Sequence, residues 1–148
     1  MNLIYSLWFM MIGSFIIQML VMSRIMTNSS ANIKFSVGKF YMSVIMALLM
    51  GLLEVLMYDI HTHDISLYYY FLLFFILIVF MYLYRNQVYI EDKDYLEEMI
   101  EHHSMAILTS DEILQKTKSE RVKKLAETIL TTQEKEIEYM KQLIKYDV

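Results

Sequence analysis

The chain has 148 residues, of which 57% are hydrophobic, and it contains neither proline nor cysteine. The absence of cysteine excludes disulfides and thiolate metal sites, so any soft-metal chemistry would rely on the 14 methionines and 4 histidines. The net charge of −4 lies within residues 85–148, since residues 1–84 are neutral overall, and such an acidic segment is a poor candidate for nucleic-acid binding.

Three apolar segments are long enough to cross a lipid bilayer, at residues 3–22, 40–57 and 67–84. At a rise of about 1.5 Å per residue, about 20 helical residues span the ~30 Å hydrocarbon core. Tyrosines at both ends of the third segment, and Trp8 near the start of the first, are typical of membrane interfaces. The first segment lacks the basic start and the small-residue cleavage site of a signal peptide. We therefore expect a membrane domain over residues 1–84.

The second segment carries a methionine stripe, because Met42, Met46, Met50 and Glu54 recur every four residues and so share one helix face. A carboxylate within a membrane span often has a function, whereas one near the end of a span can reach the interface. A transporter subunit that uses this stripe is a third possible function. The loop expected at residues 58–66 holds two histidines beside an aspartate, which could also capture a divalent metal.

Loop charges predict the orientation. With three spans, the connection at residues 23–39 and the chain after residue 84 lie on the same side of the membrane. Both carry lysine or arginine, whereas residues 58–66 carry neither. The positive-inside rule therefore places the C-terminal domain in the cytoplasm.

Residues 85–148 form the second predicted domain, a soluble hairpin of two amphipathic helices. From residue 92 onward the apolar positions follow an i, i+3, i+4, i+7 rhythm. The inward positions of the first helix are Tyr95, Leu96, Met99, Ile100, His103, Ala106, Ile107, Ser110 and Ile113. A Thr-x-x-Glu capping box that begins at Thr117 predicts the start of the second helix. Its inward positions are Val122, Leu125, Ala126, Ile129, Gln133, Ile137, Met140 and Ile144.

Two helices bury little apolar surface on their own. We therefore expect the hairpin to complete a four-helix bundle, most simply by self-association into a homo-oligomer.

The sequence Met-Ile-Glu-His-His-Ser-Met at residues 99–105 brings thioethers and imidazoles together. On a helix, Met99 lies three and four residues before His102 and His103, so each pair can share a face. Thioether and imidazole ligands suit copper, especially Cu(I), better than magnesium or calcium. The alternative is a core histidine beside ordinary apolar methionines.

This motif is followed after about thirty residues by Gln-Glu-Lys-Glu-Ile-Glu-Tyr-Met at residues 133–140. Together they resemble the domain of unknown function 305 family, which pairs a Met-Ile-Pro-His-His helix with a Gln-x-x-Glu-Ile-x-x-Met helix. The resemblance covers about residues 91–146. It implies a ferritin-like fold, a link to copper binding and resistance in some members, and in a group of them three membrane spans before the domain. It also implies a domain outside the cytoplasm, in conflict with the loop charges.

The resemblance implies a metal site in this hairpin. Its ligands would be Met99, His102, His103 and Met140, with Gln133 and Glu136 as ligands or close partners. The chain departs from the family pattern at Glu101, where proline is usual, and at Thr109, where methionine is common; Met105 could substitute for the latter. The Glu-x-x-His pairs of di-iron bundles are absent, which argues against ferritin-type redox catalysis.

The sequence thus predicts an all-α protein in which three transmembrane helices precede a soluble hairpin, a ferritin-like half-bundle. The expected function is copper binding or handling in the membrane without enzymatic activity. The main alternative is a structural or oligomerisation protein anchored in the lipid bilayer, whose histidines are merely packed or solvated.

Overall fold

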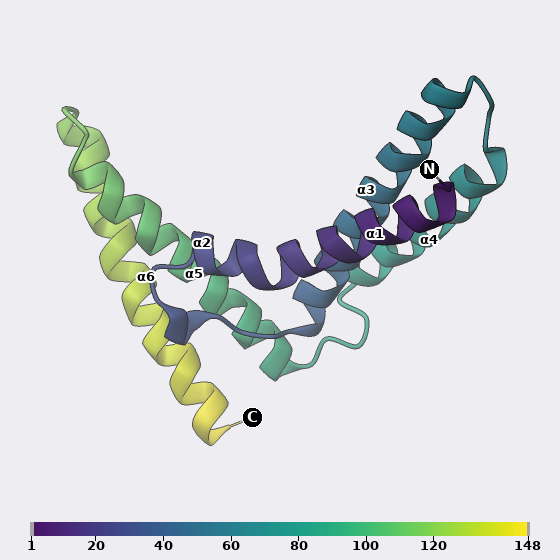
Figure 1. The fold of residues 1–148 in the computed structure, drawn as a ribbon. Coiled ribbons are helices and arrows are strands. Elements are labelled where there is room, and N and C mark those ends of the chain that lie inside the picture. The colour runs from purple at the N-terminus through teal and green to yellow at the C-terminus, as the bar shows by residue number, and fades with distance from the viewer. Residues whose placement is uncertain (1, 148) are drawn as a thin grey trace. The chain divides into compact units, whose positions relative to one another are not determined.

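The computed structural model describes residues 2–147, which are almost entirely helical and contain no strand (Figure 1). This confirms the all-α prediction. The helices are α1 (Leu3–Ile16), α2 (Ser23–Met26), α3 (Val37–Thr62), α4 (Leu67–Arg85), α5 (Asp92–Leu114) and α6 (Glu120–Tyr146). A π-helical segment, Ile17–Met22, joins α1 to α2, and a 3-10 turn, Ser30–Asn32, follows α2. The chain divides into two compact units, Met1–Val21 with Val37–Tyr89, and Met22–Ser36 with Ile90–Val148.

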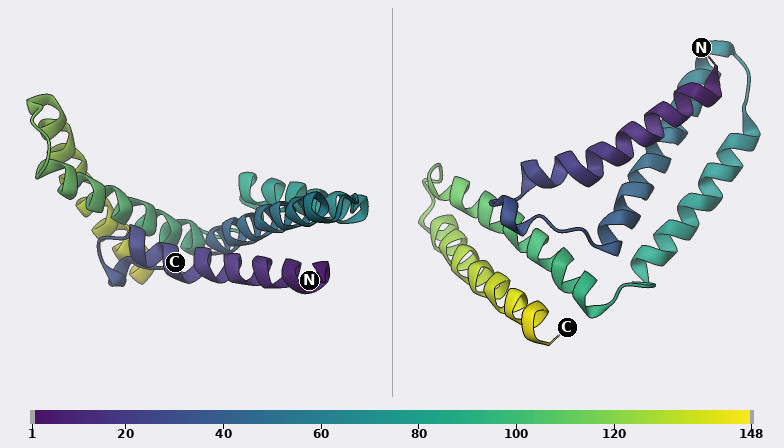
Figure 2. Two further views of the ribbon diagram at one scale, coloured as in Figure 1. Left: turned by 45° about the horizontal axis from the view of Figure 1, so that its top comes forward. Right: turned by 60° about the horizontal axis from the view of Figure 1, so that its bottom comes forward.

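In the first unit, α3 packs against both α1 and α4 (Figure 2). The buried core of this unit consists of Leu3, Leu7, Leu48, Val55, Leu73 and Leu77. Gly51 of α3 lies directly against α1, since a Cβ at this position would lie 3.1 Å from the sulfur of Met11. The absence of a side chain there lets the two helices pack tightly.

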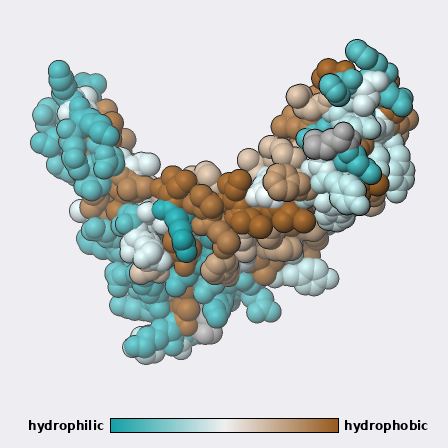
Figure 3. Space-filling view, in the orientation of Figure 1, coloured by the Kyte–Doolittle hydropathy of each residue, from teal (hydrophilic) through white to brown (hydrophobic). Residues whose placement is uncertain are grey.

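Three helical stretches are long and apolar enough to cross a membrane, namely Leu3–Met26, Val37–Thr62 and Leu67–Arg85. Many of their large apolar side chains are exposed, such as Trp8, Phe71 and Phe75, and Figure 3 shows hydrophobic surface over much of α1. Exposed apolar patches of this size mark contact with a membrane or a partner. The three predicted apolar helices are therefore present, and each extends at least as far as its predicted span.

The loop predicted at residues 58–66 is shorter than expected, because α3 continues to Thr62. The helix ends at His63, whose φ of 56° is the left-handed conformation common just beyond helix C-termini. Asp59, near the end of α3, then accepts a hydrogen bond from the backbone N–H of Ser66 at 3.0 Å. The two histidines of this region are thus divided between the end of α3 and the loop.

In the second unit, α5 and α6 pack side by side as an antiparallel hairpin (Figures 1 and 2). Its core consists of Ile100, Ile107, Ile137 and Met140, lined by Leu96, Met99 and Ile144. The capping box lies at the start of α5, between Glu91 and Asp94, and the one predicted at Thr117 is wrong. Ser119 caps α6 instead by accepting a hydrogen bond from Val122 N–H, and the Thr117 hydroxyl accepts one from Ser119 N–H.

The predicted inward stripe is wider than the surface that the hairpin buries. Tyr95, Ile113, Val122 and Leu125 were all expected to face inward, yet they are 51%, 40%, 42% and 61% exposed. A pair of helices can bury only the line along which they meet. The remaining apolar residues therefore stay on the surface of the hairpin.

The segment Met22–Ser36, expected to be a simple connection, belongs to the same compact unit as the hairpin and packs on α5. The hydroxyl of the fully buried Ser104 accepts the backbone N–H of Asn28 at 3.0 Å and donates to its side-chain oxygen. Asn32 donates to that same oxygen at 3.1 Å. The backbone N–H of Lys34 donates to Glu101 at 3.1 Å. These bonds attach the segment along one side of α5.

We expect Ser104→Ala to destabilise this unit by about 1–3 kcal/mol, because it removes the two hydrogen bonds between Ser104 and Asn28, each worth about 0.5–1.5 kcal/mol. Hydrogen exchange of the α5 amides in the full chain would measure the loss, together with faster exchange in residues 22–36. Thr109→Ala is the matched control, because this exposed α5 hydroxyl bonds only to carbonyls of its own helix. Its effect should stay within about 0.5 kcal/mol. Equal effects of the two substitutions would contradict the attachment.

Candidate metal site in the hairpin

The hairpin brings His103 of α5 next to Glu136 of α6. The His103 Nδ1 atom lies 3.2 Å from Glu136 Oε2, and the two side chains are 23% and 48% exposed. Gln133 donates from Nε2 to the same carboxylate oxygen at 3.2 Å. The three side chains come from facing helices, which meet here because Ile100 and Ile137 pack in the core nearby.

The His103 contact is not a formed hydrogen bond. Its Nδ1 atom is buried and lacks a hydrogen-bond partner in the described part of the chain, although it is close to Glu136. An unsatisfied buried polar atom costs about 1–3 kcal/mol. Such atoms in native structures call for an explanation, and a role in binding a metal ion is one.

Two thioethers lie in the apolar cluster beside this pair. Met140 is 7% exposed and belongs to the hairpin core, and Met99 packs against that core. Met99 precedes His103 by one helical turn, and Met140 follows Glu136 by one turn, so each thioether shares a helix face with its neighbour. Of the predicted residues, the structure brings His103, Glu136 and Gln133 into contact and places Met99 and Met140 in the apolar core of the same hairpin.

The two other predicted residues lie elsewhere. His102 is half exposed, and its Nε2 atom lies 3.7 Å from Glu98 Oε1, one turn earlier on α5. The nearby Glu98 carboxylate raises the pKa of His102 above its usual value, against the opposing effect of partial burial, and the charge of Glu101 acts in the same direction as Glu98. Met105 lies about 200° around α5 from His103, so it does not face this pair. Neither residue joins the cluster.

The donor set is unsuited to hard metal ions. Within residues 2–147, no three His, Cys, Asp or Glu side chains lie close enough to hold a metal ion. The imidazole and carboxylate of His103 and Glu136 could therefore hold an ion only together with the thioethers. That mixture fits a soft ion such as Cu(I) far better than Mg²⁺, Ca²⁺ or iron.

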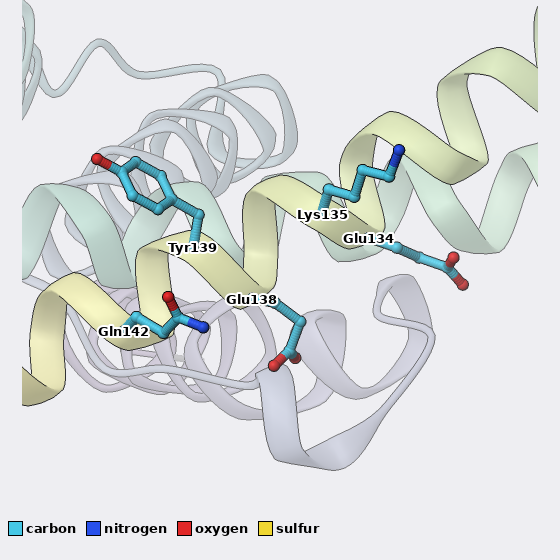
Figure 4. A pocket seen from close by; sticks show the side chains of 5 residues that line it. All are labelled: Glu134, Lys135, Glu138, Tyr139 and Gln142. Carbon is cyan, nitrogen blue, oxygen red and sulfur yellow. The ribbon is translucent and has the colours of Figure 1, made fainter.

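Other surfaces are less suited to a site. A shallow hollow on α6 is lined by Glu134, Lys135, Glu138, Tyr139 and Gln142. Figure 4 shows these side chains spread along one helix without converging on a point. In the first unit, Met42 and Met46 of the methionine stripe are about 40% exposed on α3.

Sequence reasoning missed two interactions here. The pairing of Glu98 with His102 could have been found from their four-residue spacing on a helix. The role of Ser104 in holding Asn28 could not, because no local pattern links residues so distant in sequence.

Comparison with known proteins confirms the family resemblance of the C-terminal part of the chain. Residues 83–144 match the family described as a domain of unknown function (DUF305). The chain is also 34% identical over 135 residues to an uncharacterized protein, L153, of Acanthamoeba polyphaga mimivirus. That match covers 91% of this chain and 88% of the viral protein, so it includes the apolar helices as well as the hairpin. No solved structure matches this chain.

We expect the pKa of His102 to lie above 6.5, its ordinary value, and Glu98→Gln to lower it. A raised pKa stabilises the folded state below pH ~6.5, and this contribution disappears as the pH rises through the pKa of the folded protein. NMR titration of histidine side chains in the full chain would measure both effects. Glu134→Gln, an exposed carboxylate on α6, is the control and should leave His102 unchanged. A His102 pKa at or below 6.5 would contradict the pairing.

Proposed function

This chain belongs to the same protein family as mimivirus protein L153 and carries a DUF305 domain. From its apolar helices and from the donor atoms of its hairpin, we propose that it is a non-catalytic membrane protein that binds copper. In this proposal α1, α3 and α4 anchor the chain in a lipid bilayer, and the hairpin holds the ion. Copper is its cargo.

The anchoring role is supported by the three long apolar helices and by their exposed surfaces. Side chains such as Phe9, Phe71 and Phe75 are at least two-thirds exposed. In water the exposure of these apolar side chains would be unfavourable, whereas in a bilayer they would contact the apolar lipid tails. Tyrosines at both ends of α4 suit the two interfaces of a bilayer.

The observation that carries the copper proposal is the buried Nδ1 atom of His103. This atom has no hydrogen-bond partner in the described part of the chain, and two thioethers belong to the core of the same hairpin. A bound Cu(I) would take the lone pair of this nitrogen and those of the Met99 and Met140 thioethers. Glu136 would balance the positive charge, and Gln133 would hold that carboxylate in place through its hydrogen bond. Thioether donors favour the lower oxidation state of copper.

The second candidate is a structural or interaction module that binds no metal. The exposed apolar side chains of the hairpin favour it, since they call for a partner whether or not copper binds. In this alternative the Met99 and Met140 side chains only fill the core.

We expect the loop at residues 63–66 and the C-terminus to lie on opposite sides of the membrane, because one span, α4, separates them. The chain has no cysteine, so single cysteines at Asp64 and Asp147 can be labelled with a membrane-impermeant maleimide without background. Labelling of both positions from one side would exclude the three-span arrangement. The side on which Asp147 reacts also decides between the cytoplasmic location that the loop charges favour and the external one implied by the family resemblance.

We expect Met99→Leu combined with His103→Gln to remove most Cu(I) affinity from the full chain in detergent, at least about tenfold. Leucine keeps the volume of methionine, so the hairpin should stay folded. Competition with a chromogenic Cu(I) chelator would measure affinity, and circular dichroism would measure helix content. Variants are best made in a background of His61→Ala and His63→Ala, which removes the loop histidines as a second source of binding.

The matched control is Met105→Leu combined with His102→Gln, which makes the same chemical changes outside the cluster. It should retain nearly full affinity. Equal copper affinity in the two double variants would exclude this site and favour the structural alternative.

A further inference from the structure

One side of α5 contacts the segment Met22–Ser36, and the opposite side is exposed. Ser104, which bonds to the segment Met22–Ser36, lies nine residues from both Tyr95 and Ile113. Nine residues correspond to about 900° of helix rotation, so both side chains point to the side opposite Ser104. One side of α5 is therefore covered by the chain itself, and the other side presents exposed apolar residues.

The exposed residues of α6 extend this surface. Leu125 lies eleven residues before Glu136 and so within about 20° of it on the helix. On α5, His103 is displaced by about 40–60° from the core residues Ile100 and Ile107 toward the side of Tyr95. Since Glu136 contacts His103 across the hairpin, we infer that Leu125 lies on that same side. We call the surface formed by Tyr95, Ile113, Val122 and Leu125 the open face; each of these residues is at least 40% exposed.

The charges flanking the open face are unequal at its two ends. At the tip of the hairpin, residues 115–124 contain five basic side chains and one acidic one. At its base, residues 91–101 contain six acidic side chains and one basic one. An anionic lipid surface or a nucleic acid would attract the tip but repel the base. A second hairpin running in the opposite direction satisfies both ends at once.

We propose that the open face binds the open face of a second copy of this chain, with the two hairpins antiparallel. This dimer is independent of metal binding. It gives the hairpin the two further helices that a stable bundle needs. A two-fold axis makes the contact self-complementary, so that each residue pair occurs twice.

The geometry selects particular contacts. Tyr95 and Ile113 lie eighteen residues apart, which is about five turns and ~27 Å along α5. They stand on either side of the middle of α5 (Asp92–Leu114) and share one face. In the antiparallel dimer, Tyr95 of each copy therefore meets Ile113 of the other. The basic Arg121 at each tip likewise approaches the acidic Asp92 at the opposite base.

The cysteine-free chain allows a direct test. Full-length Tyr95→Cys and Ile113→Cys, carrying different tags, are mixed in detergent and treated with a short bifunctional maleimide. The antiparallel dimer gives the mixed Tyr95–Ile113 cross-link at several times the yield of either homodimer. Glu138→Cys is the control, because this exposed α6 position lies outside the open face, and its cross-linking measures random collision.

Charge exchange tests the same arrangement without cysteines. Arg121→Glu or Asp92→Lys alone should weaken the dimer about threefold to tenfold by analytical ultracentrifugation at low salt, and the double variant should restore it. If the double variant regains the dimer affinity of the unmodified chain, the two residues form a pair across the dimer. Damage to a helix end by either single substitution would not be repaired by the second one.

Three results would overturn the proposal. Homodimer cross-links that exceed the mixed product would indicate parallel hairpins. Mixed cross-linking no stronger than that of Glu138→Cys would indicate no dimer at this face. A monomer in detergent that binds vesicles of anionic lipid through the tip would indicate that the open face meets a membrane instead.

Discussion

The organisation of the second unit depends on one constraint: two helices cannot bury all of their apolar surface against each other. α5 and α6 meet along one line, and Ile100, Ile107, Ile137 and Met140 fill it. What remains lies on the two sides of that line. On one side the chain supplies its own cover, and on the other it leaves an apolar surface exposed. The hairpin is thus a half-bundle whose two sides are completed by different means.

The cover explains how a connection between two apolar helices becomes part of another unit. Residues 27–36 are mostly polar and rich in serine and asparagine, so they cannot form a core. They attach instead by hydrogen bonds to buried positions, above all through Ser104 and Asn28. Because both ends of this segment lead into apolar helices, the chain passes between the two units at three places, after residues 21, 36 and 89. A fragment that began at residue 91 would lack this cover.

The periodic parts of the structure could be predicted from sequence, and the long-range parts could not. Apolar length placed the three helices of the first unit, and the 3.6-residue rhythm placed α5 and α6 to within a few residues. The antiparallel hairpin then brought His103 to Glu136. Side-chain exposure was less predictable, because Tyr95 and Leu125 fit the apolar rhythm but lie beyond the contact line. The capping of α6 by Ser119 was missed because two hydroxyl residues compete for that position.

The candidate site contains a buried polar atom, His103 Nδ1, that has no hydrogen-bond partner in the described part of the chain. A histidine in a core normally gives both ring nitrogens a partner, and Glu136 is near enough to serve His103 but is not aligned with it. A purely structural site would be improved by a small rotation that forms this bond, or by an apolar residue in place of His103. A ligand site has the opposite requirement, since the nitrogen must stay available while neighbouring thioethers exclude water. Met99 and Met140 lie on the helix faces that meet this condition, which is why the soft-metal proposal rests on His103 and not on the more exposed His102.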